Sequence, residues 1–586
     1  MGWAYRMRRQ PEDLVNVKFD ALVIGGGIYG ACVARDAALR GLRVALVERG
    51  DFGGGTSFNS LKIIHGGFRY LQQLDFRRLR ESVRERRYWL WAAPHLVRPL
   101  QFMIPTHGRT TRSPAALRAA AALYNLLSAD RNRGLAALQR IPGGRTLPSE
   151  ALQETMPGLA AGNSGAAEWY DAQVVDTEHL LLACLRDAVA AGATIANYVD
   201  AKSLLGGSLA VTGARCADRV TGSEFDVRAR VVVETTGPFT GNFSGQGTMP
   251  DHAQVKSINL LVPRLGAAGA FGINAPSRSN SQATKRLLFT TPWRGFSLIG
   301  TTHEVHTGRA EDCRLSEEDI ACFLADINAA IPGADLTLND VLWAYCGLIP
   351  AEDNGGGSRR TSGARRGRLA DHAMNSGQAG LISVVGEKYT TARAMAERVT
   401  DRVLEHLRFS PRPCLVATRQ LPGAPPEGGI GWLAEDFHRH VRQPLTPPFQ
   451  ELLESYGTAY SDVLGIAEYE SLGESSPPAH ELYRRRSLYG IRHEMAIHLD
   501  DLVLRRTDLA VRGLLPDALV DWTADLMAAE HAWSPQRREL EIARVRRQLR
   551  GNGTAPDITG ADGHCNAQLL RDAVTSGVGE PARGVG

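Results

Sequence analysis

The 586-residue chain lacks several features that would each assign it to a particular class of protein. It has no apolar run of ~18 residues, which a membrane-spanning helix requires. Its first ten residues, MGWAYRMRRQ, lack the ~7–15-residue apolar core of a secretory signal, so we expect a cytoplasmic protein. Its eight cysteines are scattered without a Cys-x-x-Cys pair, so their spacing indicates neither a metal site nor a disulfide framework.

The chain also has little net charge, a formal +4 at pH 7. A balance this small gives no indication of nucleic-acid binding. Hydrophobic residues make up 43% and charged residues 22%, as in ordinary globular proteins. The length exceeds what one hydrophobic core supports, so we expect two or three domains.

Residues 19–48 carry the pattern of a dinucleotide-binding βαβ unit. The apolar run 19–24 predicts a buried strand, and Gly25, Gly27 and Gly30 follow with the spacing G-x-G-x-x-G. In this motif one glycine allows a tight turn, the next admits a pyrophosphate, and the last lets the helix pack closely on the strand. The N–H groups at the start of that helix favour a bound anion.

A second strand of this unit, residues 44–47, ends at Glu48. A carboxylate at this offset, ~20 residues after the glycines, accepts hydrogen bonds from a ribose 2′-OH. It would repel the 2′-phosphate of an NADP-type cofactor, so we expect a dinucleotide without that phosphate.

Further α/β elements are spread along the chain. The segments 176–197, 229–237 and 380–398 read as strands and helices of the same layer, and the β-prone runs of 254–305 predict an inserted antiparallel sheet. Residues 114–129 predict a helix. Prolines then cluster after residue 410, and the apolar spacing beyond them is helical.

A second motif follows the βαβ unit: GGGTS at 53–57, then LKIIHGGFRYL at 61–71. With these stretches the chain resembles the FAD-dependent glycerol-3-phosphate dehydrogenases, within the wider group of flavoproteins related to D-amino-acid oxidase. The resemblance runs from about residue 19 to about 545. Its other supporting stretches are GGGIYGA…RDAALRG (25–41), APHLVRPLQFMIP (93–105), FSLIGTTHE (296–304), WAYCGLIP (343–350), GEKYTTARAMAE (386–397) and RHEMAIHLDDLVLRRT (492–507).

The fold class that this resemblance implies is α/β. A Rossmann-type FAD-binding domain would be interleaved with an antiparallel-sheet substrate domain, with a C-terminal all-helical domain added. The expected divisions are 1–90, 166–245 and 370–410 for the FAD-binding domain, 91–165 and 246–369 for the substrate domain, 411–447 for a linker, 448–550 for the helical domain and 551–586 for a disordered tail.

The resemblance implies FAD as the cofactor. The Thr56 and Ser57 hydroxyls would lie near the pyrophosphate, and Lys62 and His65 would border the flavin ring, where positive charge stabilises the reduced form. The expected cofactor contacts are Gly25, Gly27, Gly30, Glu48, Thr56, Ser57, Lys62, His65, Gly66, Gly67, Gly237, Gly386, Lys388 and Thr390.

Arg69, Tyr70 and Lys388 match the family's substrate-binding positions. A guanidinium and an ammonium suit a phosphate or carboxylate, so we expect an anionic substrate. The expected catalytic residues are His65, Arg69, Tyr70 and Lys388. The expected substrate contacts are Arg69, Tyr70, Asn259, Ile349, Arg366 and Lys388.

Two positions depart from the family pattern. The family motif G-x-R-P carries an arginine where this chain has Ile349, and Asn259 lies in the segment where the family has a histidine. Losing an arginine removes roughly 1.5–3 kcal/mol per charge-assisted hydrogen bond. Arg366, in the Gly/Ser/Arg-rich segment 353–368, could replace that cation, and His303 could replace the histidine.

The expected reaction is oxidation of a secondary alcohol to a ketone. A base would take the hydroxyl proton while a hydride passes to flavin N5. Glycerol 3-phosphate is favoured, with a larger phosphorylated polyol, a sugar or a specialised-metabolite alcohol as alternatives. An FAD-dependent amine or amino-acid oxidase and a non-catalytic flavoprotein also remain open.

The partners are less defined by the sequence. The electron acceptor would be a molecule such as a quinone or oxygen, and an oligomer is compatible with the sequence. Six arginines between residues 77 and 87 are interpreted mainly as a solvated helix face. The alternative is a face that associates peripherally with the inner side of a membrane, as family members do.

Overall fold

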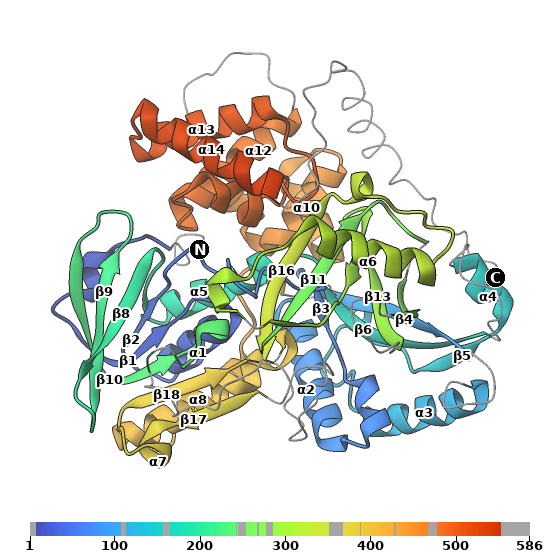
Figure 1. The fold of residues 1–586 in the computed structure, drawn as a ribbon, viewed down its shortest axis with the longest axis horizontal. Helices are drawn as coiled ribbons and strands as arrows, with labels where there is room; N and C mark the ends of the chain where they lie inside the picture. Colours follow the sequence, from blue (N-terminus) through green and yellow to red (C-terminus); the bar gives the residue numbers. More distant parts are fainter. Residues whose placement is uncertain are drawn as a thin grey trace.

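The computed structural model describes residues 7–106, 113–155, 165–241, 243, 254–266, 269–276, 285–306, 308–350, 367–386, 388–426, 429–466 and 478–551. The described residues form two sheets, with helices around them and a helical C-terminal domain above both (Figure 1). Nearly all of the predicted tail 551–586 and of the segment 353–368, Arg366 included, lies outside the described residues.

The eight described strands of the first sheet form the dinucleotide-binding layer. Six of them follow the order β17 (Arg368–Asp371), β18 (Leu381–Val385), β10 (Glu224–Glu234), β1 (Lys18–Ile24), β2 (Val44–Val47) and β7 (Thr194–Ala196). The last five are parallel, and parallel strands buried on both faces are built from apolar runs such as those of β1 and β2. The other two, β8 (Val199–Gly206) and β9 (Val211–Asp218), form a hairpin attached to β10.

Helices cover one face of this sheet. Side chains of α1 (Ile28–Leu39), α5 (Thr177–Ala190) and α8 (Ala392–Leu407) share a buried apolar cluster with the strands beneath them. The small residues of α1 allow this close packing, since Ala31 and Ala34 are fully buried. The opposite face packs against β8 and β9.

Ten described strands form the second sheet, which is largely antiparallel. Its main order is β15 (Glu304–His306), β11 (Gln254–Val262), β14 (Phe296–Gly300), β13 (Lys285–Trp293), β12 (Ala270–Pro276), β4 (Val97–Pro105), β6 (Ala166–Val174) and β3 (Ile63–Ile64). Strand β16 (Trp343–Pro350) pairs with β11, and β5 (Arg145–Leu147) with β6. The predicted antiparallel sheet is therefore present.

The domain boundary predicted at residue 166 does not match this topology. Strand β6 belongs to the second sheet, where it pairs with β4 from Val97–Val174 to Pro105–Ala166. The chain enters the first sheet only at α5 and β7. The apolar residues of β6 gave no sign of which sheet would cover them, because periodicity reports burial and not the partner strand.

Four further helices lie around the sheets. One of them, α3, begins after Ser113 as predicted, because the Ser113 hydroxyl accepts a hydrogen bond from the N–H of Ala116. These helices are α2 (Phe76–Ala92), α3 (Pro114–Leu127), α4 (Ser149–Thr155) and α6 (Glu317–Ala330), and the single-turn α7 (His372–Asn375) precedes β18.

The C-terminal domain is helical. Its described helices are α9 (Ile430–Val441), α10 (Pro447–Tyr456), α11 (Tyr460–Leu464), α12 (Pro478–His493), a π-helical segment Asp501–Arg506, α13 (Asp517–His531) and α14 (Pro535–Gly551). Helix α9 corrects the predicted linker 411–447, because its Leu433 and Phe437 are fully buried in the domain core. The prolines that suggested a linker flank this helix and do not interrupt it.

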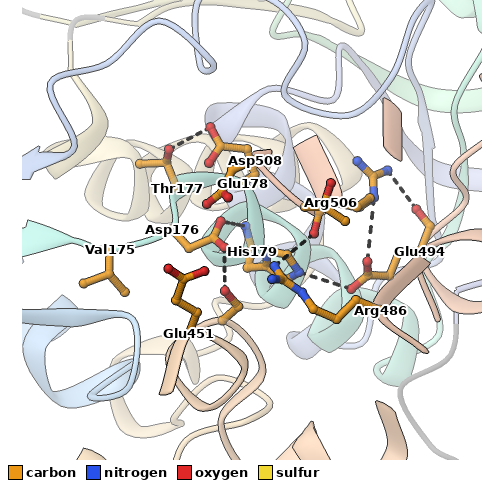
Figure 2. A network of polar contacts seen from close by, with 12 residues as sticks. Val175, Asp176, Thr177, Glu178, His179, Glu451, Arg486, Glu494, Arg506 and Asp508 are labelled. Carbon is orange, nitrogen blue, oxygen red and sulfur yellow. Dashed lines mark hydrogen bonds and ion pairs between the residues drawn. The ribbon is translucent and has the colours of Figure 1, made fainter. Parts of the chain in front are cut away.

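Buried charges attach this domain to the first sheet. Glu494 pairs with Arg186 of α5 and lies 3.7 Å from His179 (Figure 2). Burial alone would raise the pKa of Asp176, but His179 and Arg294 hold it well below its usual range. On the second sheet the attachment combines an apolar cluster that includes Trp343 and Leu502 with ion pairs such as that of Arg294 with Asp508 at 2.8 Å.

Asp51 is the clearest of these contacts. It follows β2 and receives hydrogen bonds from Arg505 at 2.6 Å and from Arg506 at 2.8 and 2.9 Å. Burial acts to raise the pKa of Asp51, but the two guanidinium groups lower it to about 2. Removing one member of a buried ion pair commonly costs about 3–5 kcal/mol, since the remaining charge is left uncompensated.

We expect Asp51→Asn to lower the free energy of unfolding at pH 7 by several times more than Glu405→Gln, which breaks an exposed pair with Arg402. The stability from ionised Asp51 is complete above the ~3.9 of a free aspartate and is lost as the pH falls through about 2. The difference from wild type should therefore shrink on acidification. Thermal unfolding, monitored by circular dichroism at several pH values, measures this difference in stability. Equal effects of the two variants would contradict the account.

Candidate active site

A cavity of about 2130 Å³ lies between the two sheets and beneath the helical domain. A drug-sized ligand occupies a pocket of about 300–1,000 Å³, so this cavity has room for a larger molecule and a second, small one. Its wall includes the carboxyl ends of β1, β2 and β10, which the register places side by side at Ile24, Val47 and Glu234. Ligands of open α/β sheets bind at such strand ends.

The three glycines of the predicted motif have different surroundings. Gly25 has φ +107°, and a Cβ there would lie 2.6 Å from the carbonyl oxygen of Thr235. At Gly30 a Cβ would lie 1.9 Å from the carbonyl oxygen of Gly25, so this glycine lets α1 approach the strand. Gly27 borders the cavity, where a Cβ would meet only the Ser57 hydroxyl, at 3.1 Å.

Glu48 lies at the cavity wall as the sequence predicted. Its carboxylate accepts from the N–H of Gly26 at 2.6 Å and from that of Gly50 at 2.8 Å. Burial raises the pKa of Glu48, while these two N–H donors act in the opposite direction. The carboxylate is thus fixed beside the glycine turn, in a position that suits a ribose hydroxyl.

Thr56 and Ser57 both line the cavity and also hold its parts together. The Thr56 hydroxyl donates to the carbonyl of Leu348 in the second sheet at 3.0 Å. The Ser57 hydroxyl accepts from the N–H of Ile28, at the start of α1, at 3.0 Å. Gly237 and Gly386 border the same cavity.

Lys62 does not border the cavity, contrary to the expectation that it would lie at a flavin ring. Its ammonium is 2% exposed and donates to the Thr177 hydroxyl at 2.7 Å and to Glu178 at 3.1 Å. A buried ammonium needs such partners, because an uncompensated charge is costly away from water.

The rest of the 65–67 motif is split between the cavity and its support. His65 and Gly67 line the cavity, whereas Gly66 and Thr390 do not. The N–H of Gly66 donates to Asp171 at 2.5 Å, and the Thr390 hydroxyl accepts from the N–H of His65 at 3.2 Å. These two residues therefore support His65 without lining the cavity themselves.

Lys388 and Tyr70 come together at one end of the cavity, although 318 positions separate them in the chain. The Lys388 ammonium donates to the Tyr70 hydroxyl at 2.6 Å and to the Ser82 hydroxyl at 3.2 Å. The guanidinium of Arg78 stacks 4.6 Å from the centroid of the Tyr70 ring. The His65 ring lies 6.0 Å from the same ring. Cationic groups and a hydroxyl thus converge where the sequence placed the substrate.

The structure describes the backbone of Arg69, in the 3-10 helix Phe68–Gln73, but not its side chain. The expected contacts of Arg69 therefore stay predictions, as do those of Arg366.

The two positions that depart from the family pattern also line the cavity. Asn259 is 2% exposed, and its amide donates to Asn59 at 2.7 Å and accepts from the Thr301 hydroxyl at 2.6 Å. Ile349 is half-buried on β16, opposite Val255 of β11. His303 lines the cavity as well, together with His65 and His498.

The part that α2 plays in the site was not predicted from the sequence. Its arginines were assigned to a solvated face, and Arg80 and Arg84 are indeed exposed. Arg86, however, is 1% exposed and pairs with Asp171 at 2.7 Å, and Arg78 lines the cavity. Arg78, Ser82 and Arg86 recur every four residues, so they share one helix face, and this spacing was the available signal.

Comparison with known proteins identifies the family of this chain. Residues 20–402 match the family model described as FAD dependent oxidoreductase, and residues 416–538 match the C-terminal domain of alpha-glycerophosphate oxidase. The chain belongs to the FAD-dependent oxidoreductase family. The match covers both sheets and, through its second part, the helical domain, so the fold inferred from the sequence is confirmed.

Individual relatives extend over nearly the whole chain. A glycerol-3-phosphate dehydrogenase of Synechocystis is 34% identical over 86% of this chain and 91% of its own length. One from Mycobacterium leprae is 30% identical over 93% and 91%. The solved glycerol-3-phosphate dehydrogenase of Bacillus halodurans, complexed with FAD, has the same fold, with a TM-score of 0.72, 24% identity and coverage of 94% and 98%.

The residues present fit FAD. Gly27 leaves open the space that a Cβ would occupy at the start of α1, and the Glu48 carboxylate faces the same cavity. FAD supplies the two-electron acceptor that no side chain provides. Among the described residues, no group of three or more His, Cys, Asp or Glu side chains is arranged to hold a metal ion.

We expect Gly27→Val to yield protein with little or no bound FAD, because the added side chain fills the space that a pyrophosphate needs. The ratio of flavin absorbance to protein absorbance measures occupancy. Gly207→Val is the matched control, since a Cβ at Gly207 meets nothing within 4 Å and Gly207 lies outside the cavity wall. A folded Gly27→Val protein with one FAD per chain would refute the assignment.

Proposed function

We propose that this FAD-dependent oxidoreductase oxidises a secondary alcohol that carries an anionic group. The observation that carries the proposal is the cluster of Lys388, Tyr70 and Arg78 at one end of the cavity. An ammonium and a guanidinium, each 4.6 Å from the centroid of the Tyr70 ring, favour phosphate or carboxylate. Relatives named glycerol-3-phosphate dehydrogenase support glycerol 3-phosphate, or a larger phosphorylated polyol, as the substrate class.

The side chains at this part of the cavity have different roles. Lys388, held by the Tyr70 and Ser82 hydroxyls, binds the anionic group as a point charge. His65, fixed through its backbone N–H, takes the proton of the substrate hydroxyl as the general base. FAD, when bound, would supply the acceptor for the two electrons of the carbinol C–H bond.

The part of the cavity wall that β16 forms affects which anionic alcohol would be preferred. Ile349 and Leu348 offer an apolar surface, and Ile349 cannot donate to a phosphate oxygen. A phosphate oxygen left without a donor in a closed site costs desolvation energy in addition to the missing bond. This wall supports a substrate with a neutral or apolar extension beyond the carbinol.

The surface supports a further proposal, peripheral association with a membrane. Leu74 before α2, Phe76 at the start of α2 and Leu126 of α3 are exposed, and the exposed Arg80 of α2 donates to the carbonyl of Leu127, next to Leu126. Apolar and basic side chains together suit an anionic lipid surface. Among the described helices, none is both long enough and apolar enough to cross a membrane. A quinone or oxygen would then serve as the electron acceptor.

We expect Lys388→Ala to lower kcat/KM for glycerol 3-phosphate by about tenfold or more, because a charge-assisted contact is lost. Steady-state turnover with an artificial electron acceptor measures it, with FAD occupancy checked by absorbance. Lys18→Ala, which changes an exposed lysine away from the cavity, should have no effect. Unchanged kcat/KM in Lys388→Ala would remove the basis for an anionic substrate.

We expect Ile349→Arg to raise kcat/KM for glycerol 3-phosphate by about tenfold, because a guanidinium on β16 can donate to the phosphate. Ile349→Ala, which removes bulk without adding a donor, is the control and should change the value little. If wild-type protein already turns over sub-millimolar glycerol 3-phosphate rapidly, and Ile349→Arg gives no gain, the preference for a larger substrate is wrong.

A further inference from the structure

Two of the scattered cysteines meet at the cavity wall. Cys313 follows the short helix Ala310–Asp312, and Cys346 lies on β16, three residues before Ile349. Their sulfur atoms are 3.7 Å apart, and both residues are half-buried and line the cavity. This pair was not predicted from the sequence, because 33 positions separate the two cysteines and their contact depends on the tertiary fold.

The charges around the pair make its two thiols unequal. Lys256 of β11 lies nearby, paired with Asp319 at 2.7 Å and with Glu304 at 3.7 Å. The hydrogen bond from Cys346, with the charges of His306 and Lys256, lowers the pKa of Cys313 to about 6. The same contact and burial raise the pKa of Cys346, so Cys313 is the thiol that ionises more readily.

We propose that Cys313 and Cys346 form an oxidation site, at which a hydroperoxide converts the two thiols to a disulfide. The sulfurs already touch, at 3.7 Å, and a disulfide bond of ~2.05 Å requires them to approach by roughly 1.6 Å. The cavity gives a small peroxide access to both. The other described cysteines have no such partner at the cavity wall: Cys322, for example, is exposed on α6.

The chemistry balances in two steps. The Cys313 thiolate attacks one peroxide oxygen, the O–O bond breaks, and Cys313 becomes a sulfenic acid while hydrogen peroxide is reduced to hydroxide. The sulfur of Cys346 then attacks the sulfenic sulfur, forming the S–S bond and releasing water. Two thiols are oxidised by two electrons, and a dithiol reductant reverses the change.

The disulfide would join the strand that carries Ile349 to the segment before α6, across the wall of the cavity. The site is independent of which alcohol the protein oxidises, because neither thiol takes part in the proposed alcohol chemistry. Its test therefore does not depend on turnover.

The experiment uses the full-length, FAD-bound protein, reduced with dithiothreitol and then exposed to a few equivalents of hydrogen peroxide. Free thiols are alkylated and peptides identified by mass spectrometry. The expected main product is a peptide pair joined through Cys313 and Cys346, formed about tenfold faster than any oxidation of Cys322, because a thiolate reacts faster than a thiol. Dithiothreitol should return both residues to alkylatable thiols.

Three variants distinguish the roles of Cys313 and Cys346. Cys322→Ser should leave the disulfide unchanged. In Cys346→Ser, Cys313 should stop at the sulfenic acid and be trapped by dimedone, whereas in Cys313→Ser, Cys346 should stay a thiol. The proposal is overturned if folded wild-type protein forms no Cys313–Cys346 link, or if Cys346 oxidises equally fast without Cys313.

Discussion

The Asp51 carboxylate, buried between Arg505 and Arg506, is the contact on which the shape of the active site most depends. Asp51 lies in the loop that leads from Glu48 to Thr56, so this loop is held from one side by the helical domain and from the other by β16. A buried charge that is fully paired tolerates little displacement, since any gap exposes it to the cost of desolvation. Such contacts fix the segments that connect the two sheets, and the sheets therefore meet around the cavity.

Within that frame the cavity has two chemically distinct ends. The glycine turn and Glu48 provide backbone donors, open space and a carboxylate, which suit the phosphates and ribose of a dinucleotide. The other end brings Lys388 and Tyr70 together with a histidine beside them. Binding in one cavity lets the cofactor and an anionic alcohol lie within reach of one another, as transfer of electrons between them requires.

Local sequence patterns predicted the βαβ unit, its glycines and Glu48, because these depend on contacts between neighbouring segments. Contacts between distant segments escaped prediction. The Lys62 ammonium pairs with a carboxylate on α5, β6 belongs to the second sheet, and α9 lies within the predicted linker. Arg78 reached the cavity from a helix face whose charges looked solvated. For Lys62 and β6 the deciding partner is distant in the chain: Glu178 is 116 positions from Lys62, and β4 pairs with β6 across 61 to 77 positions. For α9 and Arg78 the helical spacing was visible in the sequence, but composition outweighed it.

The central claim, that one cavity binds FAD and an anionic alcohol, is tested most directly by anaerobic reduction of the bound flavin, followed by the loss of its absorbance. The panel contains glycerol 3-phosphate, larger phosphorylated polyols, their unphosphorylated counterparts and amino acids. The account predicts that phosphorylated alcohols bleach the flavin and that their neutral counterparts do so at least tenfold more slowly, since the cationic end of the cavity has nothing to bind. Bleaching by amines or amino acids alone, or by no member of a panel that covers these classes, would contradict it.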